Sequence, residues 1–216
     1  MIELFKKLIS DNYTVKERDM GDWSHIRQNG MNFEIHSYEV ESVGYFSTLN
    51  MKAMLGLMKM QTIVFTPANV DAPLFSYDRI IALGNDTLLL ELYNTQLKDC
   101  DTSELEAAKA TAGSIPNHDL GEHWYDYLKM PASLAKKGKW MDSVYRPLCT
   151  NYMGKYVDLL KQAEPCDPKE KSTKTREYVN GLFENGGPST DQFIKMLGKD
   201  EAYSLFSKFI FSSDPE

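Results

Sequence analysis

The residue whose surroundings most suggest chemistry is Asp78, a single acid inside the strand-like run Phe75–Leu83. Successive strand residues point to opposite faces, so the face that carries Asp78 is otherwise apolar or small, with Leu74, Ser76, Ile80 and Ala82. A carboxylate on such a face either is hydrogen-bonded within the sheet or exchanges protons in a cleft. Desolvation in a cleft would raise its pKa toward a value useful for proton transfer. The sequence by itself leaves both interpretations open.

A second acid of the same segment, Asp71, stands two residues before Pro73. Aspartate side chains commonly accept hydrogen bonds from backbone N–H groups in turns, so the simplest role of Asp71 is to cap a turn before the proline. The alternative is that Asp71 belongs to the same cleft as Asp78 and contacts a ligand there.

The chain of 216 residues is acidic overall, because 24 residues are Lys or Arg and 31 are Asp or Glu, which gives a net charge of −7. This balance argues against nucleic acid as a partner, because phosphate binding depends on an excess of basic residues. An anionic ligand or partner therefore needs a local basic patch. The densest candidate is Lys136, Lys137 and Lys139, with Arg146 following on a predicted helix, although a solvated lysine loop is the ordinary alternative.

Familiar catalytic and cofactor motifs are absent: the sequence contains no GxGxxG, P-loop, GxSxG or HExxH pattern. The histidines lack ligand spacing, and no CxxC pair occurs among Cys100, Cys149 and Cys166, so we expect no metal site and a reducing cytoplasmic location. No apolar run approaches the ~20 residues of a membrane span, and the charged start does not resemble a signal peptide. We expect no membrane partner.

Alternating apolar and polar residues predict an antiparallel meander between residues 33 and 93. Turn signals at Gly56-Leu57 and Gly84-Asn85-Asp86 separate some of the runs. The predicted strands are Phe33–Val40, Gly44–Leu55, Met58–Phe65, Phe75–Leu83 and Thr87–Tyr93.

Helical spacing dominates the rest of the chain. An amphipathic helix is predicted from Met1 to about Glu17, and the later helices are Glu104–Ala112, Ser143–Glu164, Thr173–Phe183, Thr190–Leu197 and Asp200–Phe211. One antiparallel sheet between helices accounts for both halves, which predicts a three-layer α/β/α sandwich. No repeat or long linker divides the chain, so we expect a single domain over residues 1–216.

Aromatic and methionine residues are abundant in this chain, including Trp124, Tyr125, Tyr127, Trp140, Tyr145 and the series Met51, Met54, Met58 and Met60. Such side chains ordinarily fill a core. They also line large, adaptable ligand pockets, because the unbranched thioether adjusts to irregular shapes.

Two sequence segments, in this order along the chain, resemble the ferredoxin-dependent bilin reductases, whose fold is shared with red chlorophyll catabolite reductase. The first runs from Gln61 through Phe65 and then from Asp71 to Asp78, and is similar to the family's strand followed by a D-x-P-x-F-G-x-D element. The second comprises Arg176-Glu177-Tyr178, Gly187-Pro188, Gly198 and the closing run Phe206–Phe211. The resemblance covers the chain from about Tyr38 to Asp214.

The resemblance implies an oxidoreductase that acts on CH–CH groups of a linear tetrapyrrole such as biliverdin or dihydrobiliverdin, held between the sheet and the C-terminal helices. Reduced ferredoxin would supply single electrons, without a bound metal or flavin. Asp78 matches the family's catalytic sheet aspartate, which helps to protonate the bilin. The expected substrate contacts are Gln61, Asn50, Asp71, Arg146 and Phe75, and ferredoxin would dock on Lys136, Lys137 and Lys139.

The chain also departs from the family pattern. Gln61 stands where members of the family carry His or Asn. Asn50 lies near the position of a strand acid that completes the site in the phycocyanobilin-forming branch, and Gly187 stands where many members carry an aspartate. Ser76 replaces the usual glycine. With one expected proton donor left, a two-electron reduction gains weight over a four-electron reduction. The alternatives are a tetrapyrrole-binding protein of the same fold that has lost its chemistry, and an unrelated soluble protein.

Overall fold

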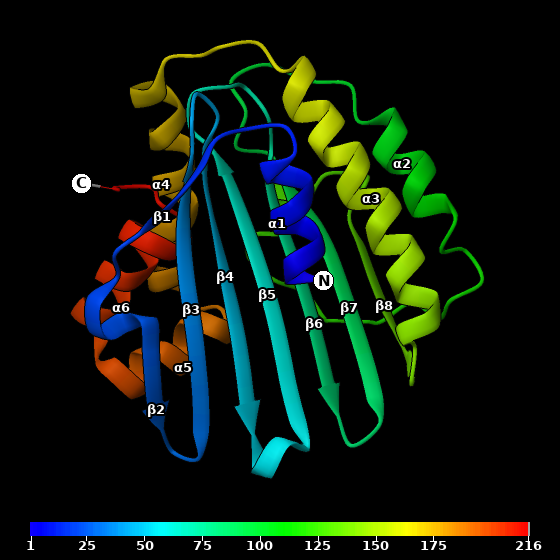
Figure 1. The fold of residues 1–216 in the computed structure, drawn as a ribbon, viewed down its shortest axis with the longest axis vertical. Helices are drawn as coiled ribbons and strands as arrows, with labels where there is room; N and C mark the ends of the chain where they lie inside the picture. The colour runs from blue at the N-terminus through cyan, green and yellow to red at the C-terminus, as the bar shows by residue number, and fades with distance from the viewer. Residues whose placement is uncertain (216) are drawn as a thin grey trace.

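One antiparallel sheet of eight strands forms the centre of the molecule, in a computed structural model that describes residues 1–215 (Figure 1). The strands are β1 (Val15–Arg18), β2 (His25–Gln28), β3 (Met31–Val40), β4 (Gly44–Ala53), β5 (Met58–Pro67), β6 (Leu74–Ala82), β7 (Asn85–Tyr93) and β8 (Leu134–Lys139). Strands β3 to β7 form a meander in chain order, β1 and β2 both pair with β3, and β8 pairs with β7. The predicted antiparallel sheet is confirmed.

Helices cover both faces of this sheet (Figure 1). On one face lie α1 (Ile2–Ser10), α2 (Ser103–Ala110) and α3 (Asp142–Gln162). On the other lie α4 (Pro168–Asn185), α5 (Pro188–Leu197), α6 (Lys199–Leu205) and the π-helical turn η4 (Phe206–Ile210). Short 3₁₀ turns are η1 (Gly21–Ser24), η2 (Met54–Gly56) and η3 (Asp126–Leu128). The predicted three-layer α/β/α sandwich is therefore confirmed.

Strand alternation divides the core between the two faces. On the α1–α3 face, buried aromatic rings of Phe65, Phe75 and Tyr156 pack together, with centroids 4.8 Å apart for Phe75 and Tyr156. On the α4–η4 face, Phe33 packs against Phe193 of α5 at 5.1 Å. The helices of the α4–η4 face cover the even-numbered residues of β5 and β6, which include Asp78.

Three local predictions were wrong, two of them at the edges of the sheet. The first helix ends at Ser10 rather than near Glu17, because Val15–Arg18 pairs with β3 as an edge strand. The lysine-rich segment around Lys137 is strand β8 rather than a loop. Helix α4 begins at Pro168, where the Asp167 side chain caps it by accepting a hydrogen bond from the backbone N–H of Lys169 at 2.8 Å.

No helix within residues 1–215 combines the length and apolar character needed to cross a membrane.

Candidate functional site

A largely apolar cavity of about 350 Å³ lies between the sheet and the second layer of helices. Its floor is formed by β3 to β7, and its roof by α4, α5 and η4. Four methionines line the sheet side, at positions Met31, Met51, Met58 and Met60. Flexible thioether side chains allow such a wall to adapt to a bulky apolar ligand. Three members of the predicted methionine series thus line the cavity, and Met51 is at the same time buried in the core.

Asp78 lies on the floor of this cavity, with two hydroxyl groups donating to its carboxylate. Thr62 Oγ1 donates to Oδ1 at 2.5 Å from the paired position on β5, and Ser76 Oγ donates to Oδ2 at 3.1 Å from the same strand. Burial raises the pKa of Asp78 to about 6, and the nearby Glu91 charge also raises it, while the two hydroxyl bonds oppose the change. The carboxyl group is thus both hydrogen-bonded in the sheet and able to exchange a proton near neutral pH.

Glu91 is a second acid on the same wall, and it was not among the residues predicted from the sequence. It lies on β7 directly opposite Ser76, with only 10% of its side chain exposed. Lys129 Nζ forms an ion pair with Glu91 Oε1 at 2.9 Å, and the Tyr93 hydroxyl donates to Oε2 at 2.8 Å. The signal that marked Asp78 was also present here, because Glu91 is the single acid in the apolar run Leu88–Tyr93.

Three tyrosines line the cavity beside the two acids. The ring centroids of Tyr93 and Tyr178 are 4.7 Å apart, and Tyr125 packs edge-on against Tyr93 at 6.0 Å. Burial raises the pKa of Tyr125 to about 12 and that of Tyr178 well above its ordinary range. These phenols therefore remain protonated, and they surround the acids with aromatic surface and neutral hydrogen-bonding groups.

No protein-family model and no curated protein sequence matches the chain. Among solved structures, the chain is similar over its full length to phytochromobilin synthase from tomato in complex with biliverdin. The TM-score is 0.78, the sequence identity is 13%, and the match covers 84% of the tomato chain. The chain has the fold of phytochromobilin synthase. The fold implied by the sequence resemblance is thus confirmed.

Two residues expected to contact a ligand in this fold lie on the wrong face of the sheet. Gln61 Nε2 donates to Asn50 Oδ1 at 3.1 Å, and neither residue lines the cavity. The spacing 78 − 61 = 17 is odd, whereas the hairpin register pairs Asp78 with Thr62. Because alternate strand residues point to opposite faces, an offset of one residue moves Gln61 away from the acid, and Thr62 takes the expected place.

Phe75 and Arg146 are also separated from the cavity by the sheet. Phe75 is fully buried in the core beneath α1 and α3. Arg146 lies on α3 with 68% of its side chain exposed, and it pairs with Asp142 at 3.5 Å. Neither placement permits contact with a ligand in the cavity, so both expected contacts are wrong.

Asp71 has a structural role outside the cavity. Its carboxylate accepts the backbone N–H groups of Leu97 and Lys98 at 2.7 and 2.9 Å, and it pairs with the buried ammonium of Lys171 at 3.2 Å. These hydrogen bonds lower the pKa of Asp71 against the effect of its burial. The expected ligand contact in the cleft of Asp78 is wrong, and Asp71 instead caps the loop that follows β7.

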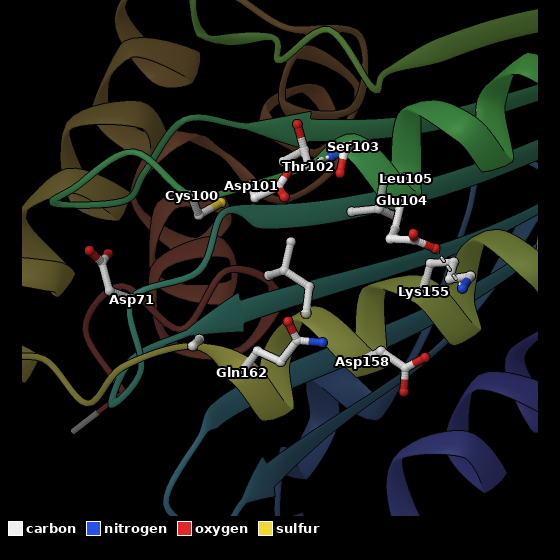
Figure 2. A pocket seen from close by; sticks show the side chains of 12 residues that line it. Asp71, Cys100, Asp101, Thr102, Ser103, Glu104, Leu105, Lys155, Asp158 and Gln162 are labelled. Carbon is white, nitrogen blue, oxygen red and sulfur yellow. Dashed lines mark hydrogen bonds and ion pairs between the residues drawn. The ribbon is translucent and has the colours of Figure 1, made fainter.

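The side of Asp71 that faces α3 belongs to a second, polar hollow of about 600 Å³, shown in Figure 2. Its acids include Asp101, Glu104 and Asp158, and its single lysine, Lys155, pairs with Glu104 at 2.7 Å. Within residues 1–215, no three His, Cys, Asp or Glu side chains are grouped closely enough to hold a metal ion. This hollow therefore offers no metal site in the described part of the chain.

The lysine cluster is split by strand β8. Lys136 is buried, and its ammonium donates to the carbonyl of Ile115 at 2.9 Å and to Asn117 Oδ1 at 2.8 Å. Lys137 and Lys139 are exposed. Lys137 pairs with Thr87 on the face of β7 that carries the cavity residue Leu89, so it projects from the cavity side of the sheet edge. The predicted docking role is wrong for Lys136, because a partner cannot reach its ammonium.

Proposed function

We propose that this protein is a ferredoxin-dependent reductase of a linear tetrapyrrole, biliverdin or dihydrobiliverdin. The observation that carries the proposal is Asp78, an acid with a pKa near 6 on the wall of an adaptable apolar cavity. The cavity lies between the sheet and the C-terminal helices, and the tomato enzyme of the same fold is known in complex with biliverdin. The fold alone would not carry the proposal, because one fold hosts many functions.

The proposed chemistry couples electrons from outside with protons from the wall. Two reduced ferredoxins each give one electron, two protons are taken up, and one double bond of the tetrapyrrole becomes a single bond. Asp78 donates a proton to the bound substrate after an electron has arrived, and it is then reprotonated from solvent. With a pKa of about 6, roughly a tenth of Asp78 holds its proton at pH 7, which suits repeated transfer.

Glu91 supports this role electrostatically. Lys129 and Tyr93 hold its carboxylate in place through an ion pair and a hydrogen bond. Its negative charge disfavours ionisation of Asp78, and so helps to keep a transferable proton on the acid beside the ligand. One readily protonated acid on the wall favours a two-electron reduction over a four-electron reduction.

We place the docking of ferredoxin at the exposed lysines Lys137 and Lys139. Both are exposed on the edge strand β8, and Lys137 lies on the face that carries the cavity, so an acidic electron donor bound there approaches the ligand. Basic contacts at such a rim increase the association rate and make it dependent on salt.

A tetrapyrrole-binding protein without reductase activity is the second candidate. Gly187, which lines the cavity from the start of α5, provides no acid where the family resemblance leads us to expect an aspartate. The absence of that carboxylate weakens proton supply from the helical side.

One experiment distinguishes the two functions. Purified protein is titrated with biliverdin, and the absorbance spectrum is recorded before and after reduced ferredoxin is added. A saturable shift at about 1:1 stoichiometry, followed by a time-dependent shift with ferredoxin, is expected for the reductase. A saturable shift with no second phase supports the binding protein, and no saturable change with any linear tetrapyrrole contradicts both.

A further inference from the structure

Large apolar side chains are exposed on the turns at one end of the sheet. Leu55 in the β4–β5 turn is fully exposed at 106%, Leu83 in the β6–β7 turn is 70% exposed, and Trp140 after β8 is 77% exposed. Leu57 adds a fourth side chain at 59%. We name these four residues the turn-end ridge. The β4–β5 and β6–β7 turns lie at the lower end of the sheet in Figure 1.

Backbone contacts join the turns into one surface. The Leu83 N–H donates to the Leu57 carbonyl at 3.3 Å, and the Trp140 N–H donates to the Gly84 carbonyl at 3.3 Å. The indole of Trp140 covers Gly84 so closely that a Cβ there would lie 3.0 Å from the ring. These contacts hold the three turns side by side, so the four exposed apolar side chains lie at the same end of the sheet, and grouped exposed apolar surface usually marks an interaction site.

The backbone conformation of these turns makes the choice of residues unusual. Leu55, Leu83 and Trp140 all have left-handed φ angles, at 55°, 50° and 54°. Glycine, asparagine or aspartate would occupy such positions at lower energetic cost and would also be better solvated. Bulky apolar residues therefore add strain without gaining burial within the described residues, and this combination indicates a role in binding.

Charge around the ridge is positive, although the whole chain is acidic. Lys52 and Lys59 bracket the first turn, and both are exposed. Of the carboxylates in the other two turn segments, Asp86 binds Arg79 at 2.7 Å, and Asp142 binds Arg79 at 2.8 Å and Arg146 at 3.5 Å. Two guanidinium groups thus balance these two carboxylates, so the charge that Lys52 and Lys59 add beside the ridge is positive.

We propose that the turn-end ridge inserts into the headgroup region of an anionic lipid membrane, with Lys52 and Lys59 binding the acidic headgroups. A protruding row of leucines and one tryptophan, flanked by lysines, matches the chemistry of a membrane interface. A protein partner is less well suited, because lysine is depleted in protein–protein interfaces. Met58, which lines the cavity, directly follows Leu57, so the ridge leads toward the cavity whatever ligand it holds.

The test uses vesicles of phosphatidylcholine, alone or mixed with phosphatidylserine, and the full chain. Wild type should co-sediment with the mixed vesicles, less so at high salt, with a blue shift of tryptophan emission. Leu55→Ser/Leu83→Ser should weaken binding about tenfold or more, and Lys52→Gln/Lys59→Gln about twenty-fivefold, at about fivefold per lysine. Trp140→Phe should retain binding and lose the blue shift. The matched control is Tyr127→Ser, which removes an aromatic ring that is also 77% exposed but lies outside the ridge.

Several results would overturn the proposal. Wild type that stays in solution with both kinds of vesicle contradicts it, as do Leu55→Ser/Leu83→Ser variants that bind as tightly as wild type. If size-exclusion chromatography shows that wild type is a dimer and the leucine variant a monomer, and wild type binds neither kind of vesicle, the ridge joins two copies of the chain. If the same variant loses affinity only for purified ferredoxin, the ridge is a protein-docking surface.

Discussion

Replacing Asp78 by asparagine tests the cavity acid through stability as well as through activity. The unfolded chain releases the Asp78 proton near pH 3.8, and the folded protein releases it near pH 6. Between these values the folded protein binds more protons than the unfolded chain, so the free energy of unfolding falls as pH rises. Above pH 6 the folded protein bears the full cost of ionising the buried Asp78, and the difference in pKa corresponds to about 3 kcal/mol of lost stability.

Asparagine does not titrate, so Asp78→Asn escapes this penalty. The exchange weakens one of the two hydroxyl bonds, from Thr62 or Ser76, at a cost of about 1 kcal/mol. Near pH 8 the variant should therefore be more stable than wild type by about 2 kcal/mol, and near pH 4 it should be equal or slightly less stable. Urea denaturation followed by tryptophan fluorescence at both pH values measures the difference.

The same variant should lose turnover while keeping its ligand. Reduction of biliverdin with reduced ferredoxin should slow about a hundredfold or more, as is typical when a positioned acid is removed, while biliverdin titration stays close to wild type. Asp22→Asn, at an exposed position in η1, is the control and should change neither property. A stability difference that does not depend on pH, or turnover at the wild-type rate, would refute the reasoning about Asp78.

Two further predictions concern the cations near the cavity. Lys129→Met leaves the buried Glu91 carboxylate without its cation, so urea denaturation should show a free energy of unfolding lower by about 2–4 kcal/mol. Adding Glu91→Gln to this variant should restore part of the lost stability. An unchanged free energy of unfolding in Lys129→Met would show that the ion pair is unimportant. Lys137→Glu/Lys139→Glu should lower ferredoxin-driven turnover and flatten its dependence on ionic strength, with biliverdin binding unchanged; equal loss of biliverdin binding would place these lysines at the substrate instead.

The sequence was most informative where alternation is strict. In β6 the period of two placed Asp78 on the cavity face and Arg79 on the opposite face, as the structure has them. The same rule explains the failures at Gln61 and Asn50, because matching a motif by its spacing leaves an uncertainty of one residue, which is enough to reverse a face. Glu91 could have been found by the logic applied to Asp78.

Other features depended on contacts that no local pattern records. Strand β1 exists because it pairs with β3, and strand β8 because it pairs with β7. Lys136 is buried because a carbonyl and an amide from residues about twenty positions earlier accept its ammonium protons. Such edge strands and buried cations are determined by tertiary structure, which overrides local propensity.

The buried Lys171 ammonium holds one helix of the cavity roof against the loops around the sheet. Besides Asp71, it donates to the carbonyls of Ala72 and Thr95 at 2.6 and 2.9 Å, and so fastens α4 to the loops at the start of β6 and the end of β7. Helix α5 is attached differently: the Thr190 hydroxyl donates to the Leu182 carbonyl of α4 at 3.2 Å, and glycines with positive φ, Gly186 and Gly198, stand at its two ends. We therefore expect α5 to open locally more readily than α4, and hydrogen exchange of the two helices would measure the difference.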